Sequence, residues 1–277
     1  MYLSRLTLDM RHPDARAWLG DCHRLHRALM SGFGQAASET ARAEFGVLFR
    51  VDPAENGLAR VLVQSRVEPR WAFETRAVRA TEGPKSLDGL ERRFMPGARF
   101  LFRLRANPTR RVHYRATQGP DLRELDTAGN WKEAAEIPEH MTTGIVRRSR
   151  AEDGRWWRER EDGKRIGNRV ELAREEDRVA WLQRRGRERD GFEVASVRVV
   201  PGPFPGEAGR ERLVAGVRAD PAGRLHGVRV DRRLTFATAL FEGELAVTDV
   251  EMFRDAFARG IGPGKAFGCG LLSLIPR

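Results

Sequence analysis

Apolar and polar residues alternate over several short stretches of this chain, and a period of two predicts β-strands. The first such stretch is residues 2–9, where Leu6 and Leu8 stand between polar neighbours. Further strands are expected over residues 45–51, 58–67, 99–108, 192–200, 228–240, 242–247 and 271–275. The alternation is clearest in residues 99–108, where Phe100, Phe102 and Leu104 would face one side of a sheet.

A helical period separates some of these strands. Leu25, Leu29 and Phe33 recur every four residues, which predicts a helix over about 22–43 that Asp21 caps and that Gly32 and Gly34 kink or end early. Two more helices are expected over residues 173–187 and from Asp249, a second cap, to residue 258. Residues 71–78 fit either a short helix or irregular structure.

The order of these elements predicts an α+β protein with two tandem ferredoxin-like (RRM-like) modules. Residues 1–94 read as strand, helix, strand and strand, and Met95-Pro-Gly97 marks a boundary. Residues 95–277 again read as strand, helix, strands, helix and strand, with an insertion over about 112–162 that we expect to be a long loop or hairpin.

A glycine-rich loop at residues 260–270 precedes the last strand. It holds five glycines, at positions 260, 262, 264, 268 and 270, with Lys265 among them. Glycine permits a positive φ and close backbone approach, and a run of free amides can face an anion such as a phosphate. The same pattern also fits a tight helix-to-strand connection, so both readings stay open.

The chain is strongly basic, with a formal net charge of +11 over 277 residues. Most of this charge lies in residues 1–111, which hold 20 Lys and Arg against 12 Asp and Glu. Such a surface favours a polyanion, nucleic acid first, although only four of the 50 basic residues are Lys, which also fits a general arginine bias. Two distant cysteines, Cys22 and Cys269, provide no disulfide framework. No apolar run is long enough to span a membrane and the first strand lacks signal-peptide character, so we expect a cytoplasmic protein.

Several segments together resemble the CRISPR repeat-processing endoribonucleases of the RAMP family, and among them the CasE family of type I-E Cascade subunits. The matching segments are Met1-Tyr-Leu-Ser4, Arg24-Leu-His26, Val63-Gln-Ser65, Phe102-Arg-Leu-Arg-Ala-Asn-Pro108, Val179-Ala-Trp-Leu-Gln-Arg184, Phe241-Glu-Gly243 and, most specific of all, Gly260-Ile-Gly-Pro-Gly-Lys-Ala-Phe-Gly-Cys-Gly-Leu-Leu-Ser-Leu274. They cover both ends and the middle of the chain, whereas residues 112–162 lie outside the resemblance.

This resemblance implies an enzyme that cuts repeat RNA at the 3′ base of a hairpin without a metal ion or another cofactor. The RNA's own 2′-hydroxyl would attack, leaving a 2′,3′-cyclic phosphate and a 5′-hydroxyl. The protein would then stay on the mature crRNA with the other Cascade subunits. Two alternatives remain: a Cascade subunit that holds the RNA hairpin but cuts slowly or not at all, and a general RRM-like RNA-binding protein.

By the resemblance, His26 is the catalytic histidine, and its near-neutral pKa suits either proton-transfer role. His23 stands one turn earlier, where relatives often have a tyrosine, so it is a second proton-transfer group, an orienting group or a surface residue. Cys22, His23 and His26 crowd one helical turn and make a poor tetrahedral metal site, so no metal site is expected. Arg27 follows the histidine and is expected to contact the scissile phosphate, unless it is simply solvated.

The remaining candidates would bind RNA. Arg103 and Arg105 share one strand face, where they would lie over a phosphate backbone or form a solvated sheet face. A basic β-hairpin that enters the groove at the base of an RNA stem is implied by the resemblance for the turn at residues 163–167. The expected RNA contacts are therefore Arg27, Arg103, Arg105, Lys164, Arg165, Arg169, Gly262, Gly264 and Lys265.

Overall fold

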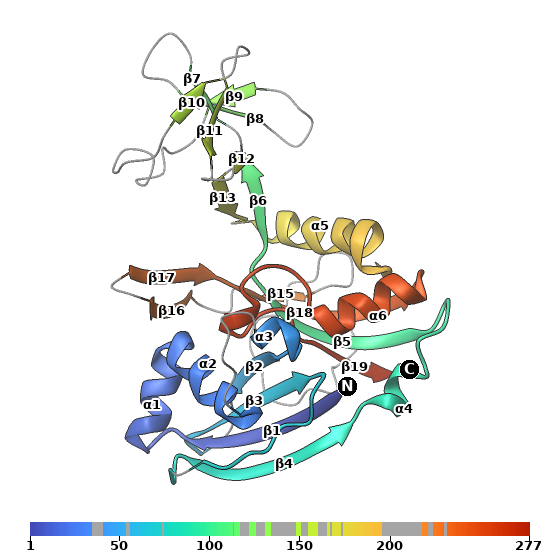
Figure 1. Ribbon diagram of the computed structural model, residues 1–277. Helices are drawn as coiled ribbons and strands as arrows, with labels where there is room; N and C mark the ends of the chain where they lie inside the picture. Colours follow the sequence, from blue (N-terminus) through green and yellow to red (C-terminus); the bar gives the residue numbers. More distant parts are fainter. Residues whose placement is uncertain are drawn as a thin grey trace. The chain divides into compact units, whose positions relative to one another are not determined.

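The computed structural model describes most of the chain, and its residues form two compact units, Met1–Pro108 with Ala173–Arg277, and Thr109–Leu172 (Figure 1). The described residues are 1–34, 41–53, 56–73, 75–112, 114–116, 122–125, 131–133, 148–150, 155–159, 165–166, 168–172, 174–195, 218–220, 224–229 and 232–277. Among them, no helix is both long and apolar enough to cross a membrane.

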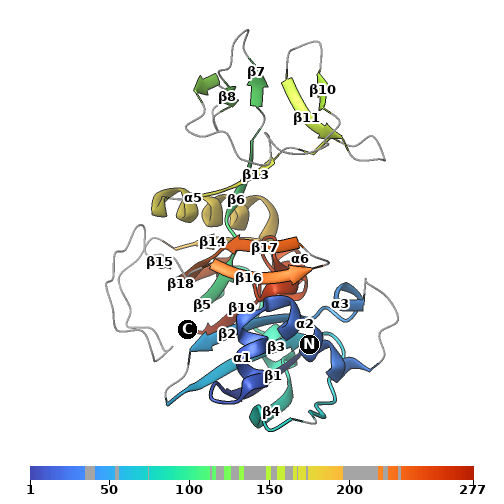
Figure 2. The same cartoon turned by 90° about the vertical axis from the view of Figure 1, so that its left-hand side faces the viewer.

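The first sheet contains four antiparallel strands. They are β1 (Tyr2–Asp9), β2 (Leu48–Pro53), β3 (Leu58–Ser65) and β4 (Val78–Ser86), in the order β2-β3-β1-β4. Helices α1 (Pro13–Gly20) and α2 (Cys22–Met30) connect β1 to β2 and lie on one face of this sheet (Figure 2). Leu6 of β1 and Leu25 of α2 belong to the buried core between them. This strand order is that of a ferredoxin-like module, as expected.

The second connection of this module differs from a regular ferredoxin-like fold. Between β3 and β4, where a second helix would stand, the described residues form no helix. Aromatic rings fill the space instead: Trp71 stacks on Phe73 with centroids 5.6 Å apart and meets Phe33 edge-on at 5.7 Å. A Cβ on Gly32 would lie 2.5 Å from the Trp71 ring, so this approach requires glycine. Of the two readings of residues 71–78, the irregular one is correct.

The second sheet repeats the strand order of the first. Four of its strands are β5 (Arg99–Ala106), β14 (Phe192–Val194), β18 (Ala239–Val247) and β19 (Leu272–Pro276), in the order β14-β18-β5-β19, and a fifth, β15 (Arg218–Asp220), also pairs with β18. Here both connections contain helices, α5 (Glu175–Arg185) and α6 (Val250–Arg259). Phe253 and Phe257 of α6 pack with Phe94, which also contacts Phe100 of β5. The α+β fold with two ferredoxin-like modules is therefore confirmed, and the predicted division at residues 94/95 falls between β4 and β5.

Several element boundaries differ from the sequence-based ones. The helix expected over 22–43 ends at Met30 and continues as a 3₁₀ turn, Ser31–Phe33, before Gly34. A short helix, α3 (Ala41–Glu44), precedes β2. Helix α1 and strand β4 were not predicted, and β18 runs through Gly243 without the expected break. This unit also contains helix α4 (Asp88–Glu91) and a pair of strands, β16 (Arg224–Arg229) and β17 (Arg232–Ala237).

The unit Thr109–Leu172 covers more residues than the predicted insertion of 112–162, and it contains short strands where a loop or hairpin was expected. Strand β6 (Thr109–Val112) pairs with β13 (Asn168–Glu171). The other strands are β7 (Tyr114–Ala116), β8 (Leu122–Leu125), β9 (Trp131–Glu133), β10 (Arg148–Arg150), β11 (Arg155–Glu159) and β12 (Arg165–Ile166), and they form a second, separate sheet.

Candidate functional site

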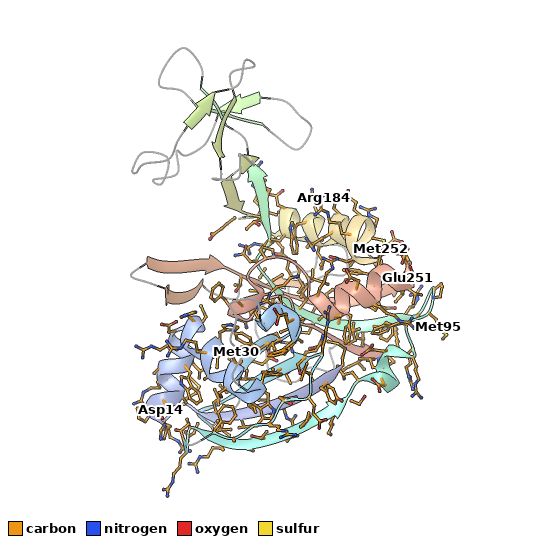
Figure 3. All side chains as sticks on the ribbon, viewed as in Figure 1. Asp14, Met30, Met95, Arg184, Glu251 and Met252 are labelled. Carbon is orange, nitrogen blue, oxygen red and sulfur yellow. The ribbon has the colours of Figure 1, made fainter. Side chains whose placement is uncertain are left out.

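Helix α2 presents the two histidines and begins at the cap that the sequence predicts. The Asp21 carboxylate accepts hydrogen bonds from the amides of His23 at 2.8 Å and Arg24 at 3.3 Å. This satisfies free amides of the first turn, which fixes where the helix starts. Cys22, Leu25 and Leu29 are buried, so the rest of the helix is set against the core. Figure 3 marks Met30, the last residue of α2.

His26 is half-buried against the first sheet. Its ring stacks on Phe49 of β2 with centroids 6.5 Å apart and planes inclined by 20°. Its Nδ1 is buried and has no hydrogen-bond partner in the described part of the chain. Burial lowers the pKa of His26 to about 4, and the positive charge of Arg42 and then His23 add to this effect. The imidazole is therefore neutral at pH 7 and has an acceptor nitrogen.

The glycine-rich loop packs against the strand that supports His26. All five glycines have a positive φ, between 77° and 92°. A Cβ on Gly268 would lie 3.1 Å from the Phe49 ring, and one on Gly260 would lie 2.7 Å from Leu48. Positive φ and contacts this close exclude most side chains. The loop of the second module thus fits against β2 of the first, next to the ring that stacks on His26.

Many amides of this loop bond to carbonyl groups of the protein. Ile261 donates to Gly270 at 2.9 Å, and Gly270 donates to Arg105 at 2.8 Å. The amides of Gly260, Phe267 and Cys269 also donate to carbonyls. Of the two sequence-based readings, the tight helix-to-strand connection accounts for these amides, since an amide already bonded to a carbonyl does not turn to a phosphate.

Lys265 is the cation that the loop contributes. Its side chain is half-buried and forms no hydrogen bond or ion pair with another of the described residues. Burial and the positive charges of nearby arginines lower the pKa of Lys265 to about 8. These arginines are, in order of effect, Arg259, Arg185 and Arg42. Lys265 is therefore mostly charged at pH 7.

One carboxylate, Asp190, influences Lys265 in the opposite direction. Its side chain is fully buried at the end of a π-helical turn, Gly186–Asp190. It already forms ion pairs with Arg185 at 2.8 Å and Arg259 at 2.7 Å. Two guanidinium groups therefore already balance the charge of Asp190, and this carboxylate has the smallest effect on the pKa of Lys265.

The other predicted site residues lie in different environments. Arg27 is exposed on α2, while Gly262 lies against Trp181 of α5 and Gly264 against Cys269 of the loop itself. Arg103 is 7% exposed and forms an ion pair with Glu242. A guanidinium that is buried and paired has no free face for a phosphate, so we leave Arg103 out of the proposed RNA contacts. Arg105, two residues later on the same face of β5, is half-buried.

The predicted basic hairpin lies in the second unit. Arg165 is in β12 and Arg169 is in β13, while Lys164 lies outside the described residues. Their role in binding RNA stays a prediction.

Two residues of the site were not predicted from sequence: Phe49, which stacks on His26, and Arg42, whose charge acts on both His26 and Lys265. No sequence signal singles out either one, since both relationships arise only when α3 and β2 fold against α2.

The thiol of Cys22 is buried, which raises its pKa to about 11. Within the described residues, no three His, Cys, Asp or Glu side chains are grouped so as to hold a metal ion.

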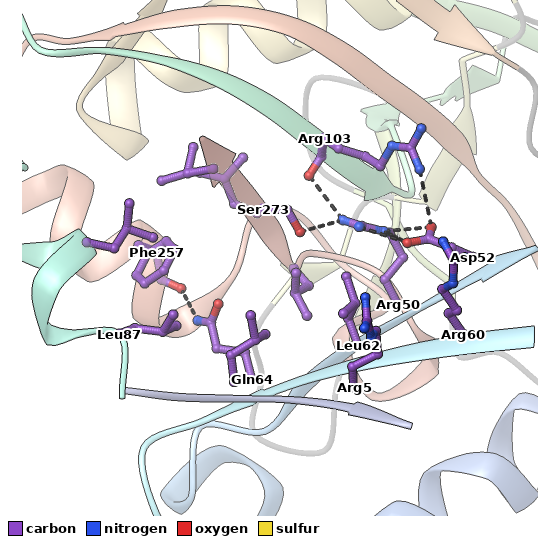
Figure 4. Close-up of a pocket in the computed structure, with 15 residues that line it drawn as sticks. Arg5, Arg50, Asp52, Arg60, Leu62, Gln64, Leu87, Arg103, Phe257 and Ser273 are labelled. Atoms are coloured by element: carbon purple, nitrogen blue, oxygen red, sulfur yellow. Dashed lines mark hydrogen bonds and ion pairs between the residues drawn. The ribbon is translucent and has the colours of Figure 1, made fainter. Parts of the chain in front are cut away.

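A cavity of about 300 Å³ lies between the two sheets, on the face of the first sheet opposite α2 (Figure 4). Arg50 and Gln64 line it, whereas Phe49 and Val63 beside them face the helices. The guanidinium of Arg50 is bound by Asp52 at 2.9 Å, by Ser273 Oγ at 2.9 Å and by the Arg103 carbonyl at 3.2 Å. Gln64 donates to the Phe257 carbonyl at 2.8 Å. These bonds join the two modules across the cavity.

The whole chain matches a known protein family. The family model described as "CRISPR associated protein" matches residues 1–276. The chain belongs to this family. Its fold and the order of its elements agree with the resemblance seen in the sequence.

Two curated relatives and a solved structure are similar along their full length. The chain is 28% identical over 279 residues to the CRISPR-associated endoribonuclease Cse3 of Thermus thermophilus and 26% identical over 277 residues to the CRISPR system Cascade subunit CasE of Escherichia coli, with 100% of each chain covered in both cases. The structure of Thermus thermophilus Cse3 bound to an RNA representing a pre-cleavage complex superposes with a TM-score of 0.60 at 27% identity, over 99% of this chain and 98% of that one.

Proposed function

We propose that this CRISPR-associated protein is an endoribonuclease that cuts CRISPR repeat RNA at the 3′ base of a hairpin, without a metal ion. The family membership and the names of the relatives support RNA processing. The observation that carries the proposal is the environment of His26, a half-buried and neutral imidazole in the neighbourhood of Arg42. Arg42 and Lys265 add positive charge there, and Asp190, the one carboxylate that acts on Lys265, is already paired with two arginines.

In the proposed reaction, the RNA supplies the nucleophile. A base removes the proton of the 2′-hydroxyl, and the 2′-oxygen attacks the adjacent phosphorus. The bond from phosphorus to the 5′-oxygen breaks, that oxygen takes up a proton from water, and the proton removed from the 2′-hydroxyl is returned to solvent. The products are a 2′,3′-cyclic phosphate and a 5′-hydroxyl. Because His26 is neutral at pH 7, it is suited to accept the first proton, which makes it the general base.

Charge stabilisation is the second requirement, since negative charge develops on the phosphate oxygens in the transition state. Lys265 is mostly charged at pH 7 and half-buried, so its ammonium acts in a site of reduced dielectric. Arg27, exposed one residue after His26, contributes to holding the RNA backbone. His23 lowers the pKa of His26 and so favours the neutral form of the base.

RNA binding is assigned to several basic residues outside this centre. Lys164, Arg165 and Arg169 would contact the base of the stem, and Arg105 the backbone, while Gly262 and Gly264 keep the loop that carries Lys265 in place. A-form stems are recognised mainly through shape and backbone, which basic side chains provide. The chain would then remain on its product together with other Cascade subunits. The name of the Escherichia coli relative, a Cascade subunit, supports the assembly with these subunits.

The test is cleavage of an end-labelled stem-loop repeat RNA in EDTA by wild type and His26→Ala. We expect wild type alone to cut, with a cyclic phosphate on the 5′ fragment, and the variant to retain binding. Binding without cleavage by either protein would instead identify an RNA-holding subunit, and cleavage only after Mg²⁺ is added would contradict the proposed mechanism.

A further inference from the structure

Arg42 is held rigidly next to the candidate site. It lies in α3, and its Nη1 donates a hydrogen bond to the Val47 carbonyl at 3.2 Å. The Val47 amide in turn donates to the Arg42 carbonyl at 2.9 Å. Val47 is fully buried, so this double link ties the backbone and the side chain of Arg42 to an immobile residue. A cation fixed in this way needs little reorganisation to meet a ligand.

Val47, which accepts the bond from Arg42, lies two residues before Phe49, which stacks on His26. Val47 immediately precedes β2, and Phe49 lies within this strand. Both belong to the core on the helix side of the first sheet. Since side chains two apart in an extended chain point to the same face, Arg42 and His26 are anchored at adjacent positions of that face.

Arg42 has no negative partner in the described part of the chain, where its side-chain bond is to a neutral carbonyl. Its guanidinium is half-buried, and burial lowers its pKa. It is also the one group that acts on the pKa of both His26 and Lys265. Gathering positive charge without a counter-ion costs free energy, and a bound anion offsets that cost.

We infer that Arg42 is a further member of the catalytic centre and that its guanidinium binds the scissile phosphate of the RNA beside His26. This inference rests on the proposed function. Arg42 contacts a non-bridging oxygen of the phosphate and stabilises the charge that grows there as the 2′-oxygen attacks. Lys265 supports the same charge from the glycine-rich loop. The bound phosphate also offsets the effect of Arg42 on His26, so the imidazole takes up the 2′-hydroxyl proton more readily once RNA is in place.

Single-turnover cleavage by Arg42→Met tests this assignment. Loss of one group that stabilises developing charge typically lowers the rate by about 100- to 1,000-fold. Binding of a repeat RNA with a 2′-deoxy nucleotide at the cleavage position should weaken far less, because the contact is strongest in the transition state. Arg93→Met removes an exposed arginine and the same net charge, and is the matched control. Equal rates for Arg42→Met and wild type would overturn the assignment.

The pKa of His26 gives a second readout, and Arg42→Lys, which keeps the charge, distinguishes loss of the charge from loss of local structure. With ¹³C-labelled histidines followed by NMR, the pKa of His26 should rise in Arg42→Met and stay near 4 in Arg93→Met. Inorganic phosphate should raise the pKa of His26 in wild type, and less in Arg42→Met. An unchanged His26 pKa in Arg42→Met, or a phosphate effect of the same size in both proteins, would contradict the proposal.

Two further outcomes separate this inference from the proposed function. If wild type cuts RNA and His26→Ala does not, while Arg42→Met cuts normally, the proposed function stands and the role of Arg42 is wrong. If wild type does not cut, both are wrong. Thermal unfolding shows whether Arg42→Met is folded, and Arg42→Lys is the second variant. Because Arg42→Lys keeps the positive charge, this variant should keep the low pKa of His26 and lose only part of the cleavage rate.

Discussion

The two modules have the same strand order but complete it differently. The second module carries a helix in both of its connections, α5 and α6, whereas the first replaces its second helix with an irregular segment packed through Trp71 and Phe73. Each module gives a different part of the site: the first provides His26 from its first connection, and the second provides Lys265 from the loop before its last strand. The candidate site thus depends on how the two modules pack together, and neither one contains it alone.

The largest effect on stability should come from breaking the bonds that join the modules. Arg50 is 1% exposed and connects β2 to Ser273 and to the Arg103 carbonyl. Arg50→Ala removes these bonds and leaves Asp52 without its closest partner, so we expect a loss of about 3–5 kcal/mol in the free energy of unfolding. Denaturant unfolding measures this loss.

Arg5→Ala is the matched control, because Arg5 forms an exposed ion pair with Glu82 on the same sheet. Exposed pairs contribute at most about 1 kcal/mol. Similar losses for both variants would show that Arg50 does not join the modules energetically.

A smaller effect is expected from the glycine-rich loop. Gly268→Ala forces an alanine to φ 86° and places its Cβ 3.1 Å from Phe49. We expect the free energy of unfolding to fall by about 2–4 kcal/mol, of which about 1–2 kcal/mol comes from the left-handed backbone. Because Phe49 supports His26, cleavage should fall as well.

Gly97→Ala isolates the backbone contribution. Gly97 has φ 79°, and nothing lies within 4 Å of where its Cβ would be. Gly97→Ala should lower the free energy of unfolding by only about 1–2 kcal/mol and leave cleavage unaffected. If Gly268→Ala were no worse than Gly97→Ala, the loop would not press on Phe49.

The smallest effects compare the helix caps of the two modules. Asp21 accepts from two amides of α2, and Asp249 accepts from the Met252 amide of α6 at 2.8 Å. Each change to Ala should cost about 1 kcal/mol, as is usual for N-caps. Only Asp21→Ala should also slow cleavage, because α2 carries His26. Slower cleavage by Asp249→Ala at matched stability would show that α6 also positions the site.

Local patterns predicted a large part of this fold. Alternation located β1 and β5, and both aspartate caps lie where short polar residues precede an apolar period. The five loop glycines all adopt the positive φ that their spacing suggested. Strand β4 was not predicted, because most of its residues are exposed at a sheet edge and its apolar and polar residues therefore do not alternate.

Long-range pairing could not be predicted from sequence. Arg103 looked like a phosphate contact, but the register of β5 and β18 places Glu242 directly opposite it. Residues 103 and 242 are too far apart in the chain for any local pattern to reveal their ion pair. The same holds for Arg42, whose relation to His26 depends on how α3 and β2 fold against α2.

The pH dependence of single-turnover cleavage tests most directly whether both modules form one site around a neutral His26. The base must be unprotonated, so the rate should rise with pH through the pKa of His26, at or above about 4. Lys265 must be charged, so the rate should fall as pH rises through about 8, and Lys265→Arg should move this fall to higher pH. A rate that declines steadily between pH 5 and 7 would mean that protonated His26 is the active form, and it would contradict the account.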